Sequence, residues 1–488
     1  MNIVSKNKLK NLIEPHFFKD LKNENYQILD IKSKNLLTPN RFDLSFKLLY
    51  LEMLDKNISF SKEIYKEHIR AFSLGKFVEP GNEEKNSIEK FENEFIKIFY
   101  DIKSNGFDNS KTFIPLSKNS TILNGAHRVA SCIYLDKNVS CVKLDIEDAI
   151  YDYEFFYKRG MDRKYLDIGA IKFVEYLQNP YIAFIWPSAK GKDEEIEKII
   201  PNIIYKKSFK LNQNGAHNLM TEIYNNEAWL GNFENHFRGA DNKVVECFKD
   251  FDSDVRVYIF TANNLDEVLK IKEDIRKVFS IGKHSIHITD TKEEALNVAN
   301  IVFNDNSIHF LNYAKPTKFI SNKNRLNQIK QFIEKNNLNS KDIVFDSSIV
   351  LSMYGLREAK DIDFLSSVKI NYNIKNINNH DEELKFYQNS KDEIIYNPKH
   401  YFYFNGIKFI SFDNLYKMKQ NRSEIKDKND CKMMEAMIEN NLFKEIISKI
   451  KQKIFYIKAK IKQNLIEFLK KVGLFEIVRN LYKAIKNA

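Results

Sequence analysis

The sequence predicts a multidomain protein of the α+β class. A chain of 488 residues is long enough for two to four domains, each with its own apolar core. The first hundred residues have mainly helical periodicity, the middle alternates between strand and helix patterns, and the end has the periodicity of basic amphipathic helices. We therefore expect four regions, which are residues 1–160, 161–320, 321–442 and 443–488.

The composition is typical of a globular protein in a reducing compartment. Hydrophobic residues make up 43% of the chain, and only nine prolines and 14 glycines occur, which argues against long flexible linkers. The four cysteines have no Cys-x-x-Cys spacing, so we expect neither disulfides nor a zinc site. The first residues lack the apolar core of a signal peptide, and no apolar run is long enough to span a membrane. We expect a cytoplasmic protein.

Two aspartates, Asp361 and Asp363, lie one residue apart in an apolar run that continues through Leu365. Such a run predicts a strand, in which residues i and i+2 point to the same face. Two carboxylates held side by side repel each other unless a cation lies between them. Paired oxygen ligands favour Mg²⁺ or Mn²⁺, which can also bind the phosphates of a nucleotide. The alternative is a solvated strand end, or a pair neutralised by Arg357 and Lys360.

The residues on both sides of this pair form a larger pattern. Ser347 and Ser348 are a small-residue pair, and residues 349–360 after them predict a short helix. Residues 401–412 predict two strands, and the helix that follows carries Lys-x-x-Arg-x-Glu-x-Lys-Asp-x-x-Asp. This arrangement, over residues 320–440, resembles the nucleotidyltransferase superfamily, in which a small pair, a helix and Asp-hydrophobic-Asp on a strand follow in that order.

The resemblance implies a mixed sheet with helices and a metal-dependent transferase of nucleotidyl or phospho groups. Asp361 and Asp363 would be the catalytic residues and the metal ligands. Ser347 and Ser348 would contact the phosphates at positions where the family usually has glycine, so the phosphate loop would be narrower or would use hydroxyl contacts. The family's other site residues would come from two sets: cations that steady the leaving group (Arg357, Lys419 and Arg422) and candidates for a third carboxylate (Asp381, Asp392 and Glu393).

A second motif lies in the N-terminal region. Residues 113–116 and 121–123 predict two strands, followed by a helix that starts near Gly125. The start of a helix with a glycine and Arg128 can bind a phosphate through free N–H groups and the guanidinium. The sequence Asn-Gly-Ala-His-Arg resembles the motif of ParB-like and sulfiredoxin-like domains, which implies that Gly125, His127 and Arg128 bind nucleotide phosphates.

Two qualifications follow from the same motif. Ala126 stands where sulfiredoxins need a cysteine, so we do not expect redox activity. In the alternative interpretation, His127 and Arg128 cap the helix and pair with the nearby acids Asp136 and Asp145.

The middle region predicts a small α/β layer. Strands are expected at residues 254–260, 285–288 and 307–311, with a helix over 265–279 and a second helix opened by the capping box Thr291–Glu294. Three histidines, His284, His287 and His309, could bind a metal or an anion, but positions 284 and 287 face opposite sides of a strand. Ordinary packed or surface histidines are the main interpretation.

The end of the chain is basic and amphipathic. From Glu445 onward there are ten lysines and one arginine against three glutamates, and isoleucines recur three or four residues apart. Such a helix can lie on the anionic face of the inner membrane or bind an acidic partner, and the alternative is a docked helix with a solvated lysine face. A second short helix is expected over 474–485. Nucleic-acid binding is not expected, because no aromatic residues alternate with base-reading side chains.

The order of these regions resembles multidomain proteins of bacterial capsule and surface-polysaccharide gene clusters. The first hypothesis is therefore a transferase that uses a nucleoside triphosphate or a nucleotide-activated donor and acts on a sugar or polyol. The second is a nucleotide-gated binding or regulatory protein that uses the Gly125 site, with a degenerate transferase domain. A third is a toxin or antitoxin type of nucleotidyltransferase, against which the long accessory regions argue. The oligomeric state is not predicted.

Overall fold

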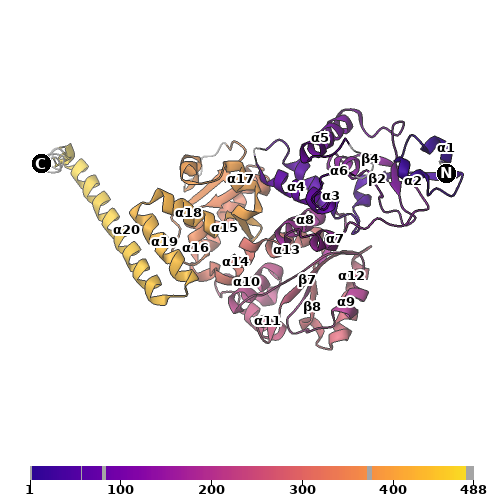
Figure 1. Cartoon of the computed structure of the whole chain (residues 1–488). Helices are drawn as coiled ribbons and strands as arrows, with labels where there is room; N and C mark the ends of the chain where they lie inside the picture. The colour runs from indigo at the N-terminus through magenta and orange to yellow at the C-terminus, as the bar shows by residue number, and fades with distance from the viewer. Residues whose placement is uncertain (1–2, 57, 80–83, 371–375, 477, 480–488) are drawn as a thin grey trace.

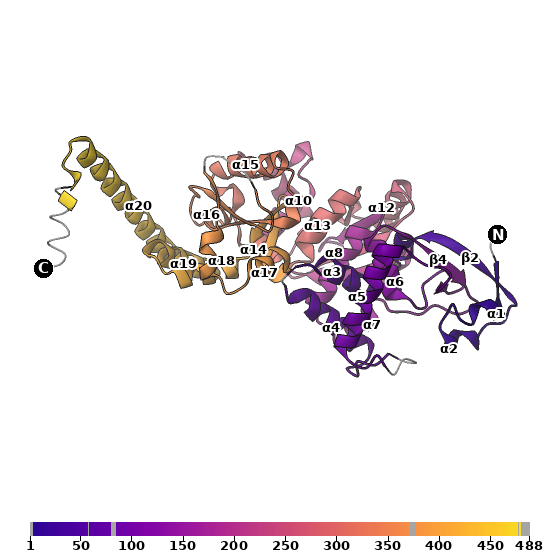
Figure 2. The ribbon, with the colours of Figure 1, turned by 90° about the horizontal axis from the view of Figure 1, so that it is seen from above.

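The computed structural model describes residues 3–56, 58–79, 84–370, 376–476 and 478–479. It shows a mixed α/β protein in which the described strands form three separate sheets (Figure 1). The molecule is elongated, with the N-terminal region at one end and a long helix projecting at the other (Figure 2). None of the described helices is both long enough and apolar enough to cross a membrane.

The N-terminal sheet has the strand order β1-β2-β4-β3, with β3 and β4 parallel and the other neighbours antiparallel. The strands and helices of this region are β1 (Ile3–Ser5), α1 (Lys6–Leu9), α2 (Pro15–Phe18), β2 (Asn25–Lys32), α3 (Asp43–Glu52), α4 (Phe60–Phe72), α5 (Ile88–Asn105), β3 (Ile114–Leu116), α6 (Ala126–Tyr134), β4 (Asn138–Lys143), α7 (Tyr153–Lys158) and α8 (Arg163–Tyr176). The strand predicted at 113–116 is confirmed as β3. The strand predicted at 121–123 is only a single bridge between Leu116 and Ile122.

The middle sheet is antiparallel and has the order β6-β7-β5-β8. The strands and helices of this region are β5 (Pro180–Ile185), α9 (Asp193–Ile199), β6 (Ile203–Phe209), α10 (Gln213–Ile223), α11 (Arg238–Phe248), β7 (Val255–Thr261), α12 (Leu265–Phe279), β8 (Ile286–Ile288), α13 (Lys292–Val302) and α14 (Asp305–Tyr313). The predicted helix over 265–279 is confirmed, and the Thr291 hydroxyl accepts a hydrogen bond from the backbone N–H of Glu294, as a capping residue does.

The strand predicted at 307–311 is wrong, because these residues lie in helix α14. Asn304 caps this helix by accepting a hydrogen bond from the N–H of Ser307. The buried residues Phe310 and Leu311 lie three and four positions after the buried Ser307, which is the spacing of one helical face. A five-residue apolar segment does not distinguish this spacing from alternation.

The C-terminal sheet has the order β11-β10-β9-β13-β12; β10 pairs antiparallel with β9, and β13 pairs parallel with β9. The strands and helices of this region are α15 (Ser321–Lys335), β9 (Ile343–Asp346), α16 (Ser348–Met353), β10 (Ile362–Ser366), β11 (Ile377–Asn379), α17 (Lys391–Tyr396), β12 (Tyr401–Phe404), β13 (Ile407–Ile410), α18 (Phe412–Arg422) and α19 (Ile425–Ile438), followed by α20 (Leu442–Lys471). The helix predicted over 349–360 ends early, at Met353, and Gly355 follows with a φ of 73°.

The predicted helix after 474 falls partly on residues outside the described part of the chain. The long helix before it ends at Lys471, and Gly473 follows with a φ of 74°, which suits a helix terminus.

One apolar core runs through all three parts of the molecule, from Leu36 to Met434. A cavity of about 430 Å³ lies where the three parts meet, and its lining includes Glu52, Lys172 and Lys408. Lys408 is 3% exposed and donates to the Ile395 carbonyl at 2.7 Å, and burial lowers the pKa of its ammonium to about 7. Asp342, which precedes β9, also lines this cavity. Strand β9 therefore begins at the cavity and ends, at Asp346, beside the predicted aspartate pair.

Candidate active site at the ends of β9 and β10

Three aspartates meet where β9 ends and β10 begins. Asp361 immediately precedes β10, Asp363 is its second residue, and Asp346 is the last residue of β9. The antiparallel register places Asp346 directly opposite Asp363. The predicted strand is confirmed over Ile362–Ser366, which contains Asp363, whereas Asp361 lies just outside it. Asp346 is a site residue that the sequence reasoning did not assign, although its position just before the serine pair was a usable signal.

Asp346 is fully buried and held by three donors. Its carboxylate accepts hydrogen bonds from His380 Nδ1 at 2.7 Å, from the Tyr387 hydroxyl and from the backbone N–H of Ser347. Burial alone would lower the pKa of His380, but the hydrogen bond and charge of Asp346 raise it above the ordinary value. His380 and Tyr387 lie 34 and 41 residues after Asp346 in the chain. No local sequence pattern predicts contacts over such separations.

Asp363 and Asp361 have different surroundings. Asp363 is 8% exposed, and burial together with the charge of Asp361 raises its pKa to about 6. Asn378 Nδ2 lies 3.5 Å from its carboxylate, which is a weak hydrogen bond. The hydroxyl of Ser348 donates to Asp361 Oδ1 at 2.8 Å, so the serine pair and the aspartate pair are in direct contact. The arrangement concentrates negative charge that a cation would stabilise.

Ser347 has a backbone conformation that suits glycine. Its φ is 65° and its ψ is −124°, a combination that costs a residue with a Cβ roughly 1–3 kcal/mol. This is the position at which the resembled family usually has glycine. The turn therefore has the backbone of a glycine-containing loop, although the residue is serine.

We expect Ser347→Gly to raise the free energy of unfolding by about 1 kcal/mol, because glycine adopts this conformation without steric strain. Ser348→Gly is the matched control and should lower it by about 1 kcal/mol, since it removes the hydrogen bond to Asp361 and places glycine in the first turn of α16. Urea unfolding of the two variants measures the difference. Equal destabilisation by both would contradict the assignment of strain to Ser347.

The three cations predicted to steady a leaving group are bound to acidic residues instead. Arg357 donates to both carboxylate oxygens of Asp430, at 2.7 and 2.9 Å. Lys419 lies 2.9 Å from Asp430 and 3.2 Å from Asp427, and Arg422 donates twice to Asp427 at 2.8 Å. The Lys-x-x-Arg-x-Glu-x-Lys-Asp-x-x-Asp motif thus forms a buried ion-pair network between α18, α19 and the turn before β10.

The alternative interpretation holds in part, because the charge of Asp361 favours the charged forms of both Arg357 and Lys360, although neither donates a hydrogen bond to the aspartate pair in the described structure. Arg357 is bound to Asp430, and the ammonium of Lys360 lies 3.6 Å from the ring centre of Tyr456.

Of the three candidates for a third carboxylate, two form contacts with residues outside the aspartate pair, and the third is the chain neighbour of one of these two. Asp381 follows His380 and pairs with Lys391 at 3.1 Å. Glu393, on α17, accepts hydrogen bonds from the backbone N–H and the hydroxyl of Ser59, at 2.6 and 2.7 Å, and so ties α17 to the N-terminal region. Asp392 is the preceding residue of the same helix. Asp346 is the carboxylate that the structure places opposite Asp363.

The N-terminal motif is partly buried, and its side chains contact other residues of this chain. Gly125 has a φ of 87° just before α6, and a Cβ there would lie 2.7 Å from Ile114 Cδ1, so the position requires glycine. His127 packs against Phe95 with ring centres 4.5 Å apart, and burial lowers the pKa of its imidazole well below the ordinary value. Its Nε2 lies 2.9 Å from the Tyr65 hydroxyl.

Arg128 pairs with Glu14 at 2.8 Å, not with Asp136 or Asp145 as the alternative interpretation expected. It also donates to the Thr112 hydroxyl. Asp136 pairs with Lys34 at 2.7 Å. The guanidinium is therefore held by residues of this chain in the described structure.

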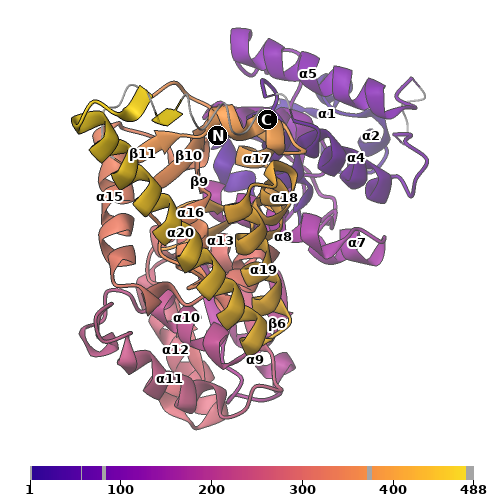
Figure 3. The same ribbon diagram turned by 90° about the vertical axis from the view of Figure 1, so that its left-hand side faces the viewer.

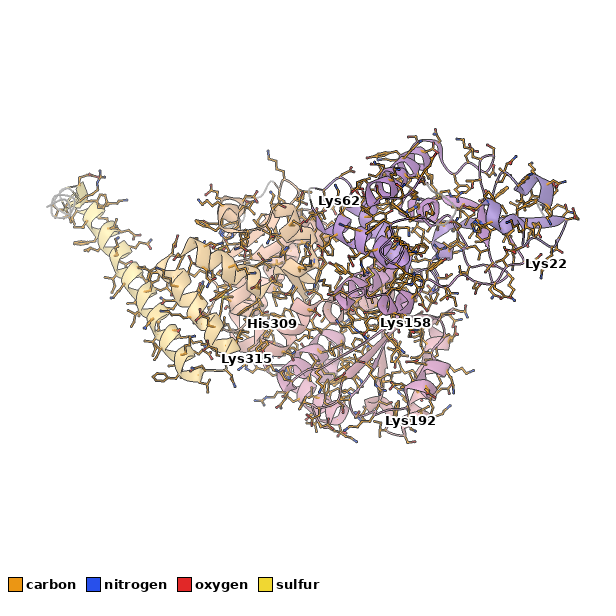
Figure 4. The ribbon with its side chains drawn as sticks, viewed as in Figure 1. Lys22, Lys62, Lys158, Lys192, His309 and Lys315 are labelled. Carbon is orange, nitrogen blue, oxygen red and sulfur yellow. The ribbon has the colours of Figure 1, made fainter. Side chains whose placement is uncertain are left out.

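The three histidines of the middle region do not share a site. His287 pairs with Glu294 at 3.2 Å, and His309 Nδ1 lies 3.0 Å from the Tyr354 hydroxyl, at the junction with the C-terminal sheet (Figure 4). His284 lies in the turn before β8. Over the described ranges, no group of three or more His, Cys, Asp or Glu side chains is arranged to hold a metal ion.

The donors at Asp361 and Asp363 nevertheless suit one kind of metal. Mg²⁺ is usually bound by one or two carboxylates and completes its coordination with water and substrate phosphates. Two adjacent carboxylates, one of them with a raised pKa, fit that requirement. Comparisons of the chain with protein-family models, with curated proteins and with solved structures found no match.

Proposed function

We propose that the C-terminal sheet carries a metal-dependent transferase of nucleotidyl or phospho groups. The observation that carries the proposal is the contact between the two parts of the site. Ser347, in a glycine-type conformation, and Ser348, hydrogen-bonded to Asp361, lie directly beside the strand that presents Asp361 and Asp363. A phosphate loop and a metal-binding carboxylate pair need this adjacency, because both contact the same phosphates.

The residues of the site have separate roles in this proposal. Asp361 and Asp363 would hold Mg²⁺ or Mn²⁺, which when bound would neutralise charge on the phosphates of the donor nucleotide. Ser347 and Ser348 would orient those phosphates through their N–H groups and hydroxyls. Asp346, whose carboxylate is bound by His380 and Tyr387, would fix the segment after β11 beside Asp363, its neighbour in the β9–β10 pairing.

The acceptor in the proposal is a hydroxyl of a sugar or polyol, used in bacterial surface-polysaccharide assembly. It comes from the resemblance of the domain order and not from a contact in the structure. Arg357, Lys419 and Arg422 are not assigned to the phosphates, because Asp427 and Asp430 already bind them.

The proposal is tested with the full chain, each of the four ribonucleoside triphosphates, Mg²⁺ or Mn²⁺, and a panel of sugar and polyol acceptors. We expect release of pyrophosphate or transfer of the labelled γ-phosphate with one nucleotide. Turnover should be lost in Asp361→Asn and retained in Asp413→Asn, an exposed aspartate of α18. Equal turnover in Asp361→Asn and the wild type would contradict the proposal.

The alternative function, nucleotide gating through Gly125, His127 and Arg128, stays a prediction. Binding of a phosphate there would require Arg128 to leave Glu14, since the two are paired at 2.8 Å. No contact in the described structure favours that function over the first. Arg128→Ala distinguishes the two, because only the gating function needs this side chain for nucleotide binding.

A further inference from the structure

Helix α20 carries a continuous stripe of exposed apolar side chains. The stripe consists of nine residues in three successive 11-residue repeats, the last of them directly after the helix, and each is 47–75% exposed: Phe443, Ile446 and Ile450; Ile454, Ile457 and Ile461; and Leu465, Phe468 and Val472. Soluble proteins rarely expose a contiguous apolar surface of this length, and such surfaces mark interaction sites.

In the first half of α20, the opposite face is packed against the body of the molecule, and the second half projects away from it (Figure 2). Ser448 and Gln452 are 3% exposed, and Gln452 Nε2 donates to Asp430 at 2.8 Å while its Oε1 accepts from Asn429 at 3.0 Å. Two residues along a helix turn through about 200°, so Gln452 and the stripe residues Ile450 and Ile454 lie on opposite sides. The packing against α19 therefore fixes the rotation of α20 with the apolar stripe turned outward.

The surroundings of α20 leave this outer side open. Seen from the side, α20 lies in front of α18 and α19, and no described element crosses in front of it (Figure 3). The stripe is uncovered because α20 is attached through the opposite side, which carries Ser448 and Gln452. The prediction of a docked helix is therefore correct for that polar side and not for the apolar stripe.

The spacing of the stripe favours a flat surface. An 11-residue repeat has about 3.67 residues per turn, close to the 3.6 of a straight helix, so the stripe runs nearly parallel to the helix axis. A coiled coil with a second copy of the chain would use a seven-residue repeat, and Ile447, Ile450, Ile454, Ile457 and Ile461 fit one. Asn464 and Lys471 interrupt that repeat, whereas the 11-residue repeat stays apolar to Val472. A straight apolar stripe suits the plane of a bilayer surface.

Lysines border the stripe on both sides. Helix α20 contains nine lysines and two glutamates. With about 100° per residue, Lys451, Lys458 and Lys462 lie along one edge of the stripe and Lys453 and Lys460 along the other. Within the described part of the chain these five lysines form no ion pair. Their chains can extend along the apolar surface while the ammonium groups contact anionic headgroups.

We propose that α20 lies in the plane of an anionic lipid bilayer surface, with its apolar stripe in the boundary between headgroups and acyl chains. The proposal is independent of the transferase assignment. An acidic protein partner would match the lysines but not nine exposed apolar residues in line.

The same attachment places the candidate site near this surface. Lys360, the residue before Asp361, contacts Tyr456 of α20. Helix α20, which lies on the membrane in this proposal, thus also contacts the segment that leads into β10 and its aspartates.

The test is sedimentation of the full chain with vesicles of phosphatidylcholine alone and of phosphatidylcholine with one quarter phosphatidylglycerol. We expect binding to the anionic vesicles, at least tenfold weaker binding to the neutral ones, and weakening with added salt. The triple variant Ile454→Ser/Ile457→Ser/Ile461→Ser should bind the anionic vesicles at least tenfold more weakly. Its thermal midpoint should stay unchanged, because the replaced side chains are exposed.

A matched control keeps this test specific. Leu265 and Leu269 are exposed apolar residues of α12, 42% and 47% exposed, and Leu265→Ser/Leu269→Ser should leave vesicle binding unchanged. The proposal is overturned if the wild type does not bind anionic vesicles or if the control weakens binding as much as the stripe variant. A stripe variant that only converts a dimer into a monomer would overturn it in favour of a second copy of the chain.

Discussion

Replacing Asp361 with asparagine is expected to reduce nucleotide-dependent transfer by more than about 100-fold, because the pair would lose one of its two anionic ligands for the metal. Asparagine keeps the size of the side chain and an oxygen that can accept the hydrogen bond from Ser348. The fold should therefore survive. Steady-state turnover with the preferred nucleotide measures the effect.

The same variant should have nearly the same free energy of unfolding as the wild type. In the absence of metal, burial and then the charge of Asp361 raise the pKa of Asp363, so the two carboxylates repel each other in the folded state. Removing one charge relieves that repulsion but also removes the attraction of Asp361 to Arg357 and Lys360, so the two effects oppose each other. A loss of activity without a loss of stability is typical of residues retained for function. Strong destabilisation by Asp361→Asn would instead indicate a structural role for the pair.

Replacing Asp430 with asparagine is expected to destabilise the protein by about 3–5 kcal/mol, since it leaves buried cations without their counter-charge. Asp430 is fully buried and binds Arg357, Lys419 and Gln452, which come from the turn before β10, from α18 and from α20. Denaturant unfolding of the variant gives the free-energy difference. Asp413→Asn is the control, because the exposed pair of Asp413 with Lys417 should contribute less than about 1 kcal/mol.

This stabilisation should depend on pH in a defined direction. Burial alone would raise the pKa of Asp430, but the hydrogen bonds and charges of Arg357 and Lys419 lower it below the ordinary value of 3.8. A lowered carboxyl pKa stabilises the fold above the pKa of the unfolded chain, and the effect is lost as the pH falls below it. The difference between wild type and Asp430→Asn should therefore be full at pH 7 and shrink below about pH 4. A difference that stays constant down to pH 2 would contradict the ion-pair explanation.

The sequence predicted the elements whose apolar spacing repeats over many residues or whose first residues form a capping box. Helix α12 has the predicted bounds because its apolar spacing extends over four turns, and the capping box at Thr291 marks the start of α13. The strand of Asp363 was predicted from its apolar neighbours. Residues 307–311 were misassigned because so short a segment fits both periods.

The candidate site was predicted only where its residues are close in sequence. Ser347, Ser348, Asp361 and Asp363 come together as the pattern indicated. The role of Asp430 depends on packing between helices that are far apart in the chain. The same holds for the uncovered stripe of α20: periodicity predicted an amphipathic helix, but only the contacts of Gln452 show which face is turned outward.

The most direct test of the transferase assignment is calorimetric titration of the full chain with ATP, CTP, GTP and UTP in the presence of Mg²⁺. We expect the wild type to bind one nucleotide, Asp361→Asn to lose that binding by more than about tenfold, and Arg128→Ala to keep it. Loss of binding in Arg128→Ala alone, with Asp361→Asn unchanged, would contradict the account and move nucleotide binding to the N-terminal region.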